Sequence, residues 1–163
     1  MISVEEYLRT SFPDGDREYI DGVIVERNIG EMDHSSALGE LIIFFAAYEA
    51  ARPIFAFPSL RVQVAPARVR VPDVSVYVGS EPEEQVPRTP PFLVIEILSK
   101  DDRASDLQEK IDDYLAFGVR FVWVIDPRTR RGYIHTAGGS REAKDGILRT
   151  TDPDIELQLR QLF

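Results

Sequence analysis

The chain has 163 residues, of which 44% are hydrophobic and 29% charged, proportions typical of a globular domain. It contains no cysteine and only two histidines, which excludes disulfides, cysteine nucleophiles, thiolate metal sites and zinc sites built from several histidines. A net charge of −9 argues against binding nucleic acid through general positive charge, although local basic patches remain compatible with a nucleic-acid enzyme. No apolar run approaches the ~20 residues of a membrane span. The N-terminus carries glutamates where a secretory signal has basic and then apolar residues. We therefore expect a cytoplasmic protein with no membrane partner.

The first third of the chain is predicted to form a helix, a tight hairpin and a second helix. Ser3 begins a capping-box pattern, which predicts a short helix over residues 3–11. Strands at residues 17–20 and 23–26 flank an Asp-Gly pair, a strong signal for a two-residue hairpin turn. Apolar residues then recur at helical spacing over residues 33–51.

The rest of the chain is predicted to alternate strands with one further helix. Ser105 begins a second capping pattern, and the helix that it predicts ends near Gly118. The predicted strands are residues 54–57, 60–64, 71–78, 92–98 and 119–125, followed by short β segments with turns at 128–132, 138–139 and 145–146. This order predicts one α/β domain over residues 1–163, with a mixed β-sheet flanked by helices.

Glu96 interrupts the most apolar strand of the chain. Residues 92–98 are otherwise nearly all apolar, as in a central strand buried on both faces. Burying a lone carboxylate costs several kcal/mol, and a bound metal ion is one way to offset that cost. An arginine partner, or a position at a fraying strand end, is the structural alternative.

Asp73 follows a proline at the start of the predicted strand 71–78. Alone, this pair is typical of a turn before a strand. If the strands of Asp73 and Glu96 are neighbours, however, their carboxylates meet. Two hard oxygen donors on one wall suit Mg²⁺ or Mn²⁺.

Lys110 lies on the helix after the Glu96 strand, on or near its packed face. From there its ammonium group could reach the carboxylate pair. The alternative is a solvated lysine that pairs with Asp106 or Asp113 at helical spacing. Glu18, in the first hairpin strand, is unremarkable by itself.

Two basic stretches are candidates for phosphate contacts, with an ordinary solvated face as the alternative for each. The stretches comprise Arg61, Arg68 and Arg70 before Asp73, and Arg120, Arg128, Arg130 and Arg131 around the last core strands and their turn.

His34 lies at the start of the second predicted helix. It either faces a cleft near Glu18 or has a capping or surface role.

The order and spacing of several motifs together resemble the Uma family. Its members are proposed restriction endonucleases of the PD-(D/E)XK nuclease superfamily and were long classed as a domain of unknown function. The resemblance covers about residues 3–135 and implies a restriction-endonuclease-like core with a divalent-metal site. The motifs are Glu18-Tyr-Ile-Asp-Gly, Val71-Pro-Asp-Val, Val94-Ile-Glu-Ile-Leu-Ser, Lys110 with Tyr114, Gly118-Val and Trp123-Val-Ile-Asp-Pro.

The resemblance assigns roles to individual residues. Asp73 matches the aspartate of the Pro-Asp motif, and Glu96 matches the second acidic residue. The superfamily's usual lysine, two residues further on, is replaced by Leu98. Lys110 fits a lysine that has moved to the following helix, and Glu18 matches an additional N-terminal acid.

The function implied is a Mg²⁺- or Mn²⁺-dependent endonuclease that cuts nucleic acid, with DNA as the expected substrate and a homodimer as the expected assembly. A non-catalytic nucleic-acid-binding module and a regulatory homodimer on the same fold are the alternatives. The expected catalytic residues are Glu18, Asp73, Glu96 and Lys110, the expected metal ligands are Asp73, Glu96 and the Ile97 carbonyl, and the expected substrate contacts are His34, Arg61 and Arg70.

Overall fold

The computed structural model describes residues 1–13, 15–28, 30–49 and 52–163. Its helices are α1 (Val4–Arg9), α2 (Met32–Glu49) and α3 (Ala104–Phe117), with a short 3-10 helix, η1 (Leu159–Leu162), near the C-terminus. Its strands are β1 (Arg17–Ile20), β2 (Val23–Glu26), β3 (Ile54–Pro58), β4 (Val62–Ala65), β5 (Arg68–Arg70), β6 (Val74–Val78), β7 (Leu93–Ile97), β8 (Phe121–Asp126), β9 (Arg131–Thr136), β10 (Gly139–Glu142), β11 (Ile147–Arg149) and β12 (Glu156–Gln158). None of these helices has the length and apolar character needed to cross a membrane.

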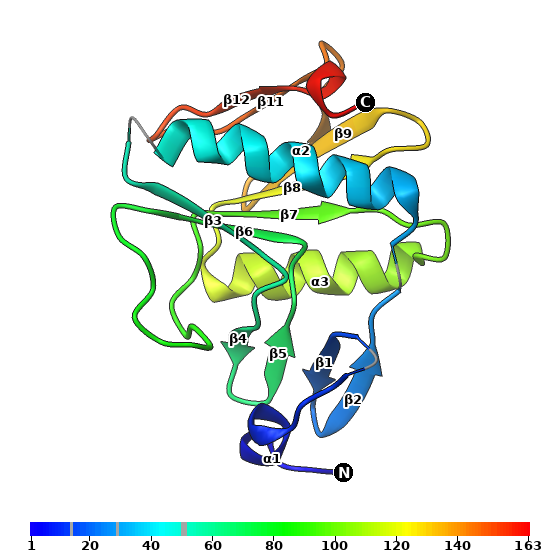
Figure 1. The fold of residues 1–163 in the computed structure, drawn as a ribbon, viewed down its shortest axis with the longest axis vertical. Coiled ribbons are helices and arrows are strands. Elements are labelled where there is room, and N and C mark those ends of the chain that lie inside the picture. The colour runs from blue at the N-terminus through cyan, green and yellow to red at the C-terminus, as the bar shows by residue number, and fades with distance from the viewer. Residues whose placement is uncertain (14, 29, 50–51) are drawn as a thin grey trace.

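The larger sheet has six strands in the order β10-β9-β8-β7-β6-β3. β7 and β8 run parallel, whereas the other neighbouring strands run antiparallel. The predicted mixed sheet is therefore confirmed. α2 covers one face of this sheet and α3 covers the other (Figure 1). This double cover explains why β7 is almost uniformly apolar.

The side chains of β7 alternate between the two helices. Ile95 and Ile97 pack into the core cluster on the α2 side. Val94 packs with Ile111 and Tyr114 of α3. Glu96 shares the face of Val94, as strand alternation requires, and its carboxylate consequently points toward α3.

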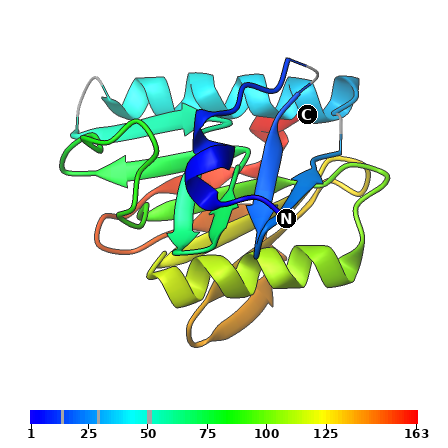
Figure 2. The same cartoon turned by 90° about the horizontal axis from the view of Figure 1, so that it is seen from below.

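A smaller sheet, in the order β2-β1-β5-β4, contains the predicted hairpin. Asp21 and Gly22 both have positive φ, as the tightest hairpin turn requires. Figure 2 shows this sheet and α1 in front, with α2 and α3 on either side of the larger sheet. The smaller sheet thereby brings β1 and β5 close to α3.

Several predicted boundaries are corrected by the structure. The strand predicted from residue 71 begins at Val74, because Pro72 has no N–H group for a ladder hydrogen bond. The helix predicted from Ser105 has Arg103 at its N-cap instead. Asp102 accepts a hydrogen bond from the Ser99 N–H group and closes the turn that precedes this helix. The predicted end of the second helix, at residue 51, lies outside the described residues.

Other strands were not foreseen in detail. β5 lies between two predicted strands, in a stretch too rich in arginine to show apolar alternation. The short β segments predicted after residue 126 are β9 to β12, of which β9 and β10 extend the larger sheet and β11 and β12 pair with each other.

Candidate active site

The larger sheet places Asp73 next to Glu96. β6 and β7 are antiparallel with Val74 opposite Ile95, so the preceding residue Asp73 stands beside Glu96. Their side chains are buried, with only 2% and 4% of each residue exposed. The Ile97 N–H group donates a hydrogen bond of 2.7 Å to Asp73 Oδ2. The two carboxylates therefore meet on one wall, as the sequence predicts for neighbouring strands.

Cations surround the Asp73 carboxylate. Arg27 Nη2 lies 2.5 Å and His34 Nε2 lies 3.3 Å from Asp73 Oδ1. Burial works to raise the pKa of Asp73, but the contact with His34 and the charges of Arg27 and His34 outweigh it and hold the pKa below its ordinary value. The same contact with Asp73 raises the pKa of His34. This carboxylate is therefore ionised and compensated by its neighbours.

Glu96 has a different environment. Burial raises the pKa of its carboxyl group to about 7, and the negative charge of Asp73 acts in the same direction. The positive charges of Lys110 and Arg27 oppose this rise without cancelling it. The Tyr114 hydroxyl group donates a hydrogen bond of 2.6 Å to Glu96 Oε1. Near neutral pH, a substantial fraction of Glu96 is therefore protonated when no metal is bound.

Lys110 leans toward the carboxylates. Its Nζ atom lies 3.8 Å from Glu18 Oε1, and its side chain is 20% exposed. Burial works to lower the pKa of Lys110, but the negative charges of Glu96 and Glu18 outweigh it and keep the pKa above its ordinary value. The alternative partner Asp113 is bound to Arg68 and Arg70 instead.

Glu18 is held by both of its carboxylate oxygens. Oε1 accepts a hydrogen bond of 3.2 Å from Arg70 Nη1. Oε2 accepts one of 2.9 Å from the Val71 N–H group. Glu18 thus ties β1 to the end of β5 and holds one carboxylate oxygen near Lys110.

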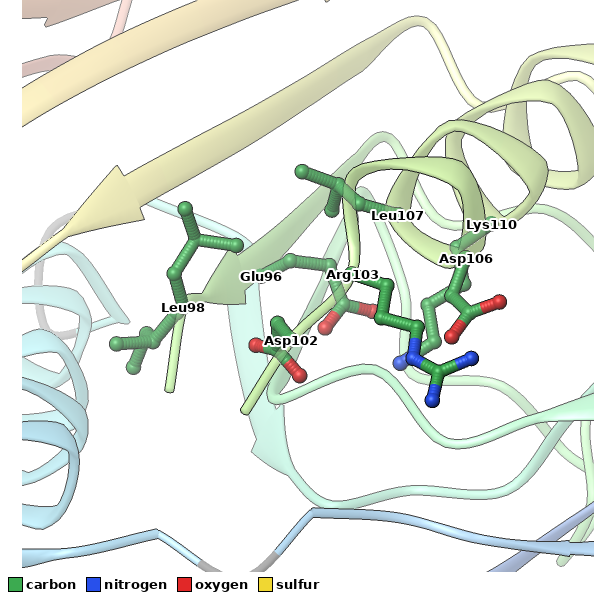
Figure 3. Close-up of a pocket in the computed structure, with 8 residues that line it drawn as sticks. Glu96, Leu98, Asp102, Arg103, Asp106, Leu107 and Lys110 are labelled. Carbon is green, nitrogen blue, oxygen red and sulfur yellow. The ribbon is translucent and has the colours of Figure 1, made fainter. Parts of the chain in front are cut away.

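Small cavities border the carboxylate pair. One of about 20 Å³ lies between the end of β7 and the first turns of α3, where Figure 3 shows Glu96 beside Asp102, Asp106 and Lys110. Another of about 20 Å³ is lined by Asp73, Glu96, Lys110 and His34, among others. Each has room for roughly one water molecule. A wider groove of about 390 Å³, between the β1–β2 hairpin and α3, includes Glu18 and Lys110 in its lining.

The predicted substrate contacts are placed differently from one another. His34 lies at the carboxylate pair, against Asp73 rather than Glu18. Arg61 lies away from the pair, with its guanidinium group 5.0 Å from the centre of the Tyr7 ring. Arg70 is only 5% exposed and is bound to Glu18 and Asp113. The structure therefore gives a position at the site to His34 but not to Arg61, and it engages Arg70 in internal ion pairs.

Arg27 is the main site residue that sequence reasoning missed. It follows β2 directly, and its partner Asp73 is far away along the chain. The sequence contained a partial signal, because a buried carboxylate calls for an arginine partner. That partner was considered for Glu96, whereas the structure gives it to Asp73.

Comparison with known proteins defines the class. The profile of the Uma2 family, described as "Putative restriction endonuclease", matches residues 4–160, and the chain therefore belongs to the Uma2 family. No curated protein gave a match.

A solved structure has the same fold. It is described as "a putative nuclease belonging to DUF820 from Anabaena variabilis" and superposes with a TM-score of 0.85 at 23% sequence identity. The match covers 100% of this chain and 98% of the other. The shared architecture confirms the fold expected from the family resemblance.

Proposed function

We propose that this protein is a divalent-metal-dependent endonuclease that hydrolyses phosphodiester bonds of nucleic acid, with DNA as its substrate. The proposal rests on the buried Asp73 and Glu96 carboxylates, which stand side by side with the Lys110 ammonium group near them. Membership of a family described as restriction endonucleases supports it.

The donor set fits a hard divalent cation. Among the described residues, no three or more histidine, aspartate or glutamate side chains converge as a metal site. Mg²⁺ does not need such a group, because it usually keeps several waters and binds one or two carboxylates. Asp73, Glu96 and the Ile97 carbonyl would hold the ion. Arg27 contacts the Asp73 oxygen that such an ion would use, so we propose that Arg27 moves aside when metal binds.

The chain's own residues then have distinct tasks. A bound ion supplies a water of lowered pKa and polarises a phosphate oxygen. Lys110 orients that water or offsets the charge that develops on the phosphate. Both oxygens of Glu18 are already engaged, so we assign it the positioning of Lys110. Tyr114 fixes the orientation of Glu96 through their hydrogen bond.

Titration with Mn²⁺ in a calorimeter tests the metal site. We expect saturable binding to the parent protein and its loss in Asp73→Asn and in Glu96→Gln. Glu109→Gln is a matched control, because Glu109 lines the wider groove without belonging to the carboxylate pair. Binding that survives both site substitutions would contradict the mechanism and favour a non-catalytic module.

Cleavage assays test the reaction. Duplex DNA, single-stranded DNA and RNA are incubated with Mg²⁺ or Mn²⁺, and the parent is compared with Glu96→Gln and Lys110→Ala. We expect both variants to lose metal-dependent cleavage. Full activity of Lys110→Ala would remove the role given to that residue. The homodimer remains a prediction, and sedimentation analysis of the protein with and without duplex DNA checks it.

A further inference from the structure

The two basic stretches noted in the sequence differ in whether their arginines are paired with acidic residues or exposed to solvent. Arg68 and Arg70 of β5 are bound by Asp21, Glu18 and Asp113. In contrast, Arg128, Arg130 and Arg131, around the turn between β8 and β9, are exposed. The side chains of Arg128 and Arg131 are 51% and 63% exposed, respectively. We refer to these three residues as the turn arginines.

The turn arginines lie at the same end of the sheet as the carboxylate pair. β8 runs parallel to β7 with Ile125 beside Ile97, and Arg131 stands opposite Asp126 in β9. Strands in a sheet are about 4.8 Å apart, so the turn lies roughly 10 Å from the end of β7. Figures 1 and 2 both show the turn after β8 at the edge where α2 begins and β7 leads into α3.

Their guanidinium groups remain available to a ligand. The Nε atoms of Arg128 and Arg131 lie 3.5 and 3.6 Å from carboxylate oxygens of Asp126 and Glu142. Their terminal nitrogens have no hydrogen-bond partner among the described residues. Such terminal nitrogens are the part of arginine that binds phosphate in a bidentate manner. Arg130 rests over the ring of Phe163, with 5.8 Å from its guanidinium carbon to the ring centre, and this contact leaves its charge uncompensated.

The wider groove beside the site is unsuitable for a polyanion. Its lining has five acidic and three basic side chains: Glu18, Glu26, Asp102, Asp106 and Glu109 against Arg27, Arg70 and Lys110. A phosphate backbone extended along this groove would meet net negative charge. In the other direction, across the end of β8, the surface passes Asp126 and reaches the three exposed turn arginines.

We propose that the turn arginines bind the backbone of duplex DNA on one side of the bond to be cut. This inference rests on the proposed function and adds where its substrate lies. A separation of about 10 Å spans only a few phosphates of one strand, so the turn arginines would contact the backbone close to the bond to be cut. A duplex is already ordered, so it can contact both places without the entropy cost of ordering a flexible strand.

A DNA-binding measurement tests this inference. The fluorescence anisotropy of a labelled duplex of about 24 base pairs is measured with the protein in EDTA, over a series of salt concentrations. EDTA prevents cleavage, so that binding is measured alone. The test variant is Arg128→Gln/Arg130→Gln/Arg131→Gln. The matched control is Arg9→Gln/Arg88→Gln/Arg120→Gln, which makes the same change in net charge at exposed arginines elsewhere. Arg120 stands at the opposite end of β8.

We expect the test variant to bind about tenfold or more weakly near 50 mM salt, and the control to bind as the parent does. Because each phosphate contact contributes about 0.9 to the magnitude of the slope of log K against log salt, this magnitude should decrease by about 2.7 in the test variant alone. Equal losses in both variants, or no loss in the test variant, would overturn the proposal. So would no duplex binding by the parent, or turn-dependent binding that favours a single strand.

Calorimetry with Mn²⁺ separates this inference from the proposed function. The turn arginines do not contact the carboxylate pair, so the test variant should bind Mn²⁺ as the parent does. Weakened DNA binding with intact Mn²⁺ binding supports the inference on its own. If the parent binds no metal, the proposed function fails, while the DNA comparison can still be judged.

Discussion

The two neighbouring carboxylates of the site have opposite environments. Asp73 is met by Arg27, His34 and the Ile97 N–H group, and its pKa is lowered. Glu96 receives the Tyr114 hydroxyl group of α3, and burial raises its pKa to about 7. Two acids on neighbouring strands thus differ in charge state when no metal is bound.

Because of this difference, the negative charge of Asp73 stabilises the fold, whereas the negative charge of Glu96 destabilises it. Asp73 neutralises Arg27, whose other partner Asp16 is exposed, and it contacts His34, so its charge contributes to the stability of the fold. Glu96 is incompletely compensated, and its charge opposes folding. A residue that costs stability and still interrupts an apolar strand is the kind found at functional sites.

The largest effect is expected from Asp73→Asn. This substitution removes the buried partner of Arg27 and should lower the free energy of unfolding by about 3 kcal/mol or more. Denaturation by urea at neutral pH measures it. Asp16→Asn is the control, because Asp16 contacts the same arginine from an exposed position and should cost less than about 1 kcal/mol. Equal effects of the two variants would contradict the stabilising role of Asp73.

Glu96→Gln should have the opposite sign. Because the pKa of Glu96 is raised from 4.5 to about 7, its proton stabilises the fold fully below about pH 4.5, and that contribution is lost as the pH rises through 7. Metal-free parent protein should therefore lose about 2 kcal/mol from this group between pH 5 and pH 8.

The glutamine variant should not show that loss, and it should be about 2 kcal/mol more stable than the parent at pH 8. His34 has a raised pKa and acts in the same direction, but it is present in both proteins and cancels in the comparison. Urea denaturation at pH 5 and pH 8 with EDTA measures the difference. A variant that is less stable than the parent at pH 8 would instead indicate a structural role for Glu96.

The sequence was sufficient for the helices, for most strands of the larger sheet and for the two carboxylates as candidates, because each is marked by local periodicity or by a clear exception to it. Glu96 could be recognised because it interrupts an apolar strand, and Asp73 because it follows Pro72. Lys110 was a candidate from its place on the helix, and the family resemblance then implied roles for Lys110 and Glu18.

The compensating charges could not be predicted in the same way. Arg27 reaches Asp73 across 46 positions, and Arg70 reaches Asp113 across 43. No local pattern encodes such contacts, because they depend on how the smaller sheet sits against α3. The sequence analysis therefore named Arg70 among the expected substrate contacts and noted Arg128 only within a second basic stretch. Only the tertiary structure separates the buried Arg70 from the exposed Arg128.

Arg27→Gln should sharpen the comparison by removing the main cation beside Asp73. A divalent ion bound at the proposed site would compete with Arg27 for the Asp73 carboxylate and be repelled by its charge. We therefore expect this variant to bind Mn²⁺ about tenfold more tightly, or about 1.4 kcal/mol. Arg17→Gln is the control, since Arg17 pairs with Glu26 outside the carboxylate pair. Weaker Mn²⁺ binding by Arg27→Gln would show that Arg27 supports the metal site.

Tyr114→Phe should produce the smallest effect at pH 5, where Glu96 is mostly protonated, and it probes the hydrogen bond to that carboxyl group. Removing a buried hydrogen bond to a neutral acceptor costs about 0.5–1.5 kcal/mol, and to a charged acceptor about 1.5–3 kcal/mol. The cost should therefore be greater at pH 8, where Glu96 is mostly charged, than at pH 5. In the Glu96→Gln background it should be small at both pH values. A double-mutant cycle of unfolding free energies measures the coupling. Additive effects at pH 8 would mean that Tyr114 serves packing alone and does not favour the charged form of Glu96.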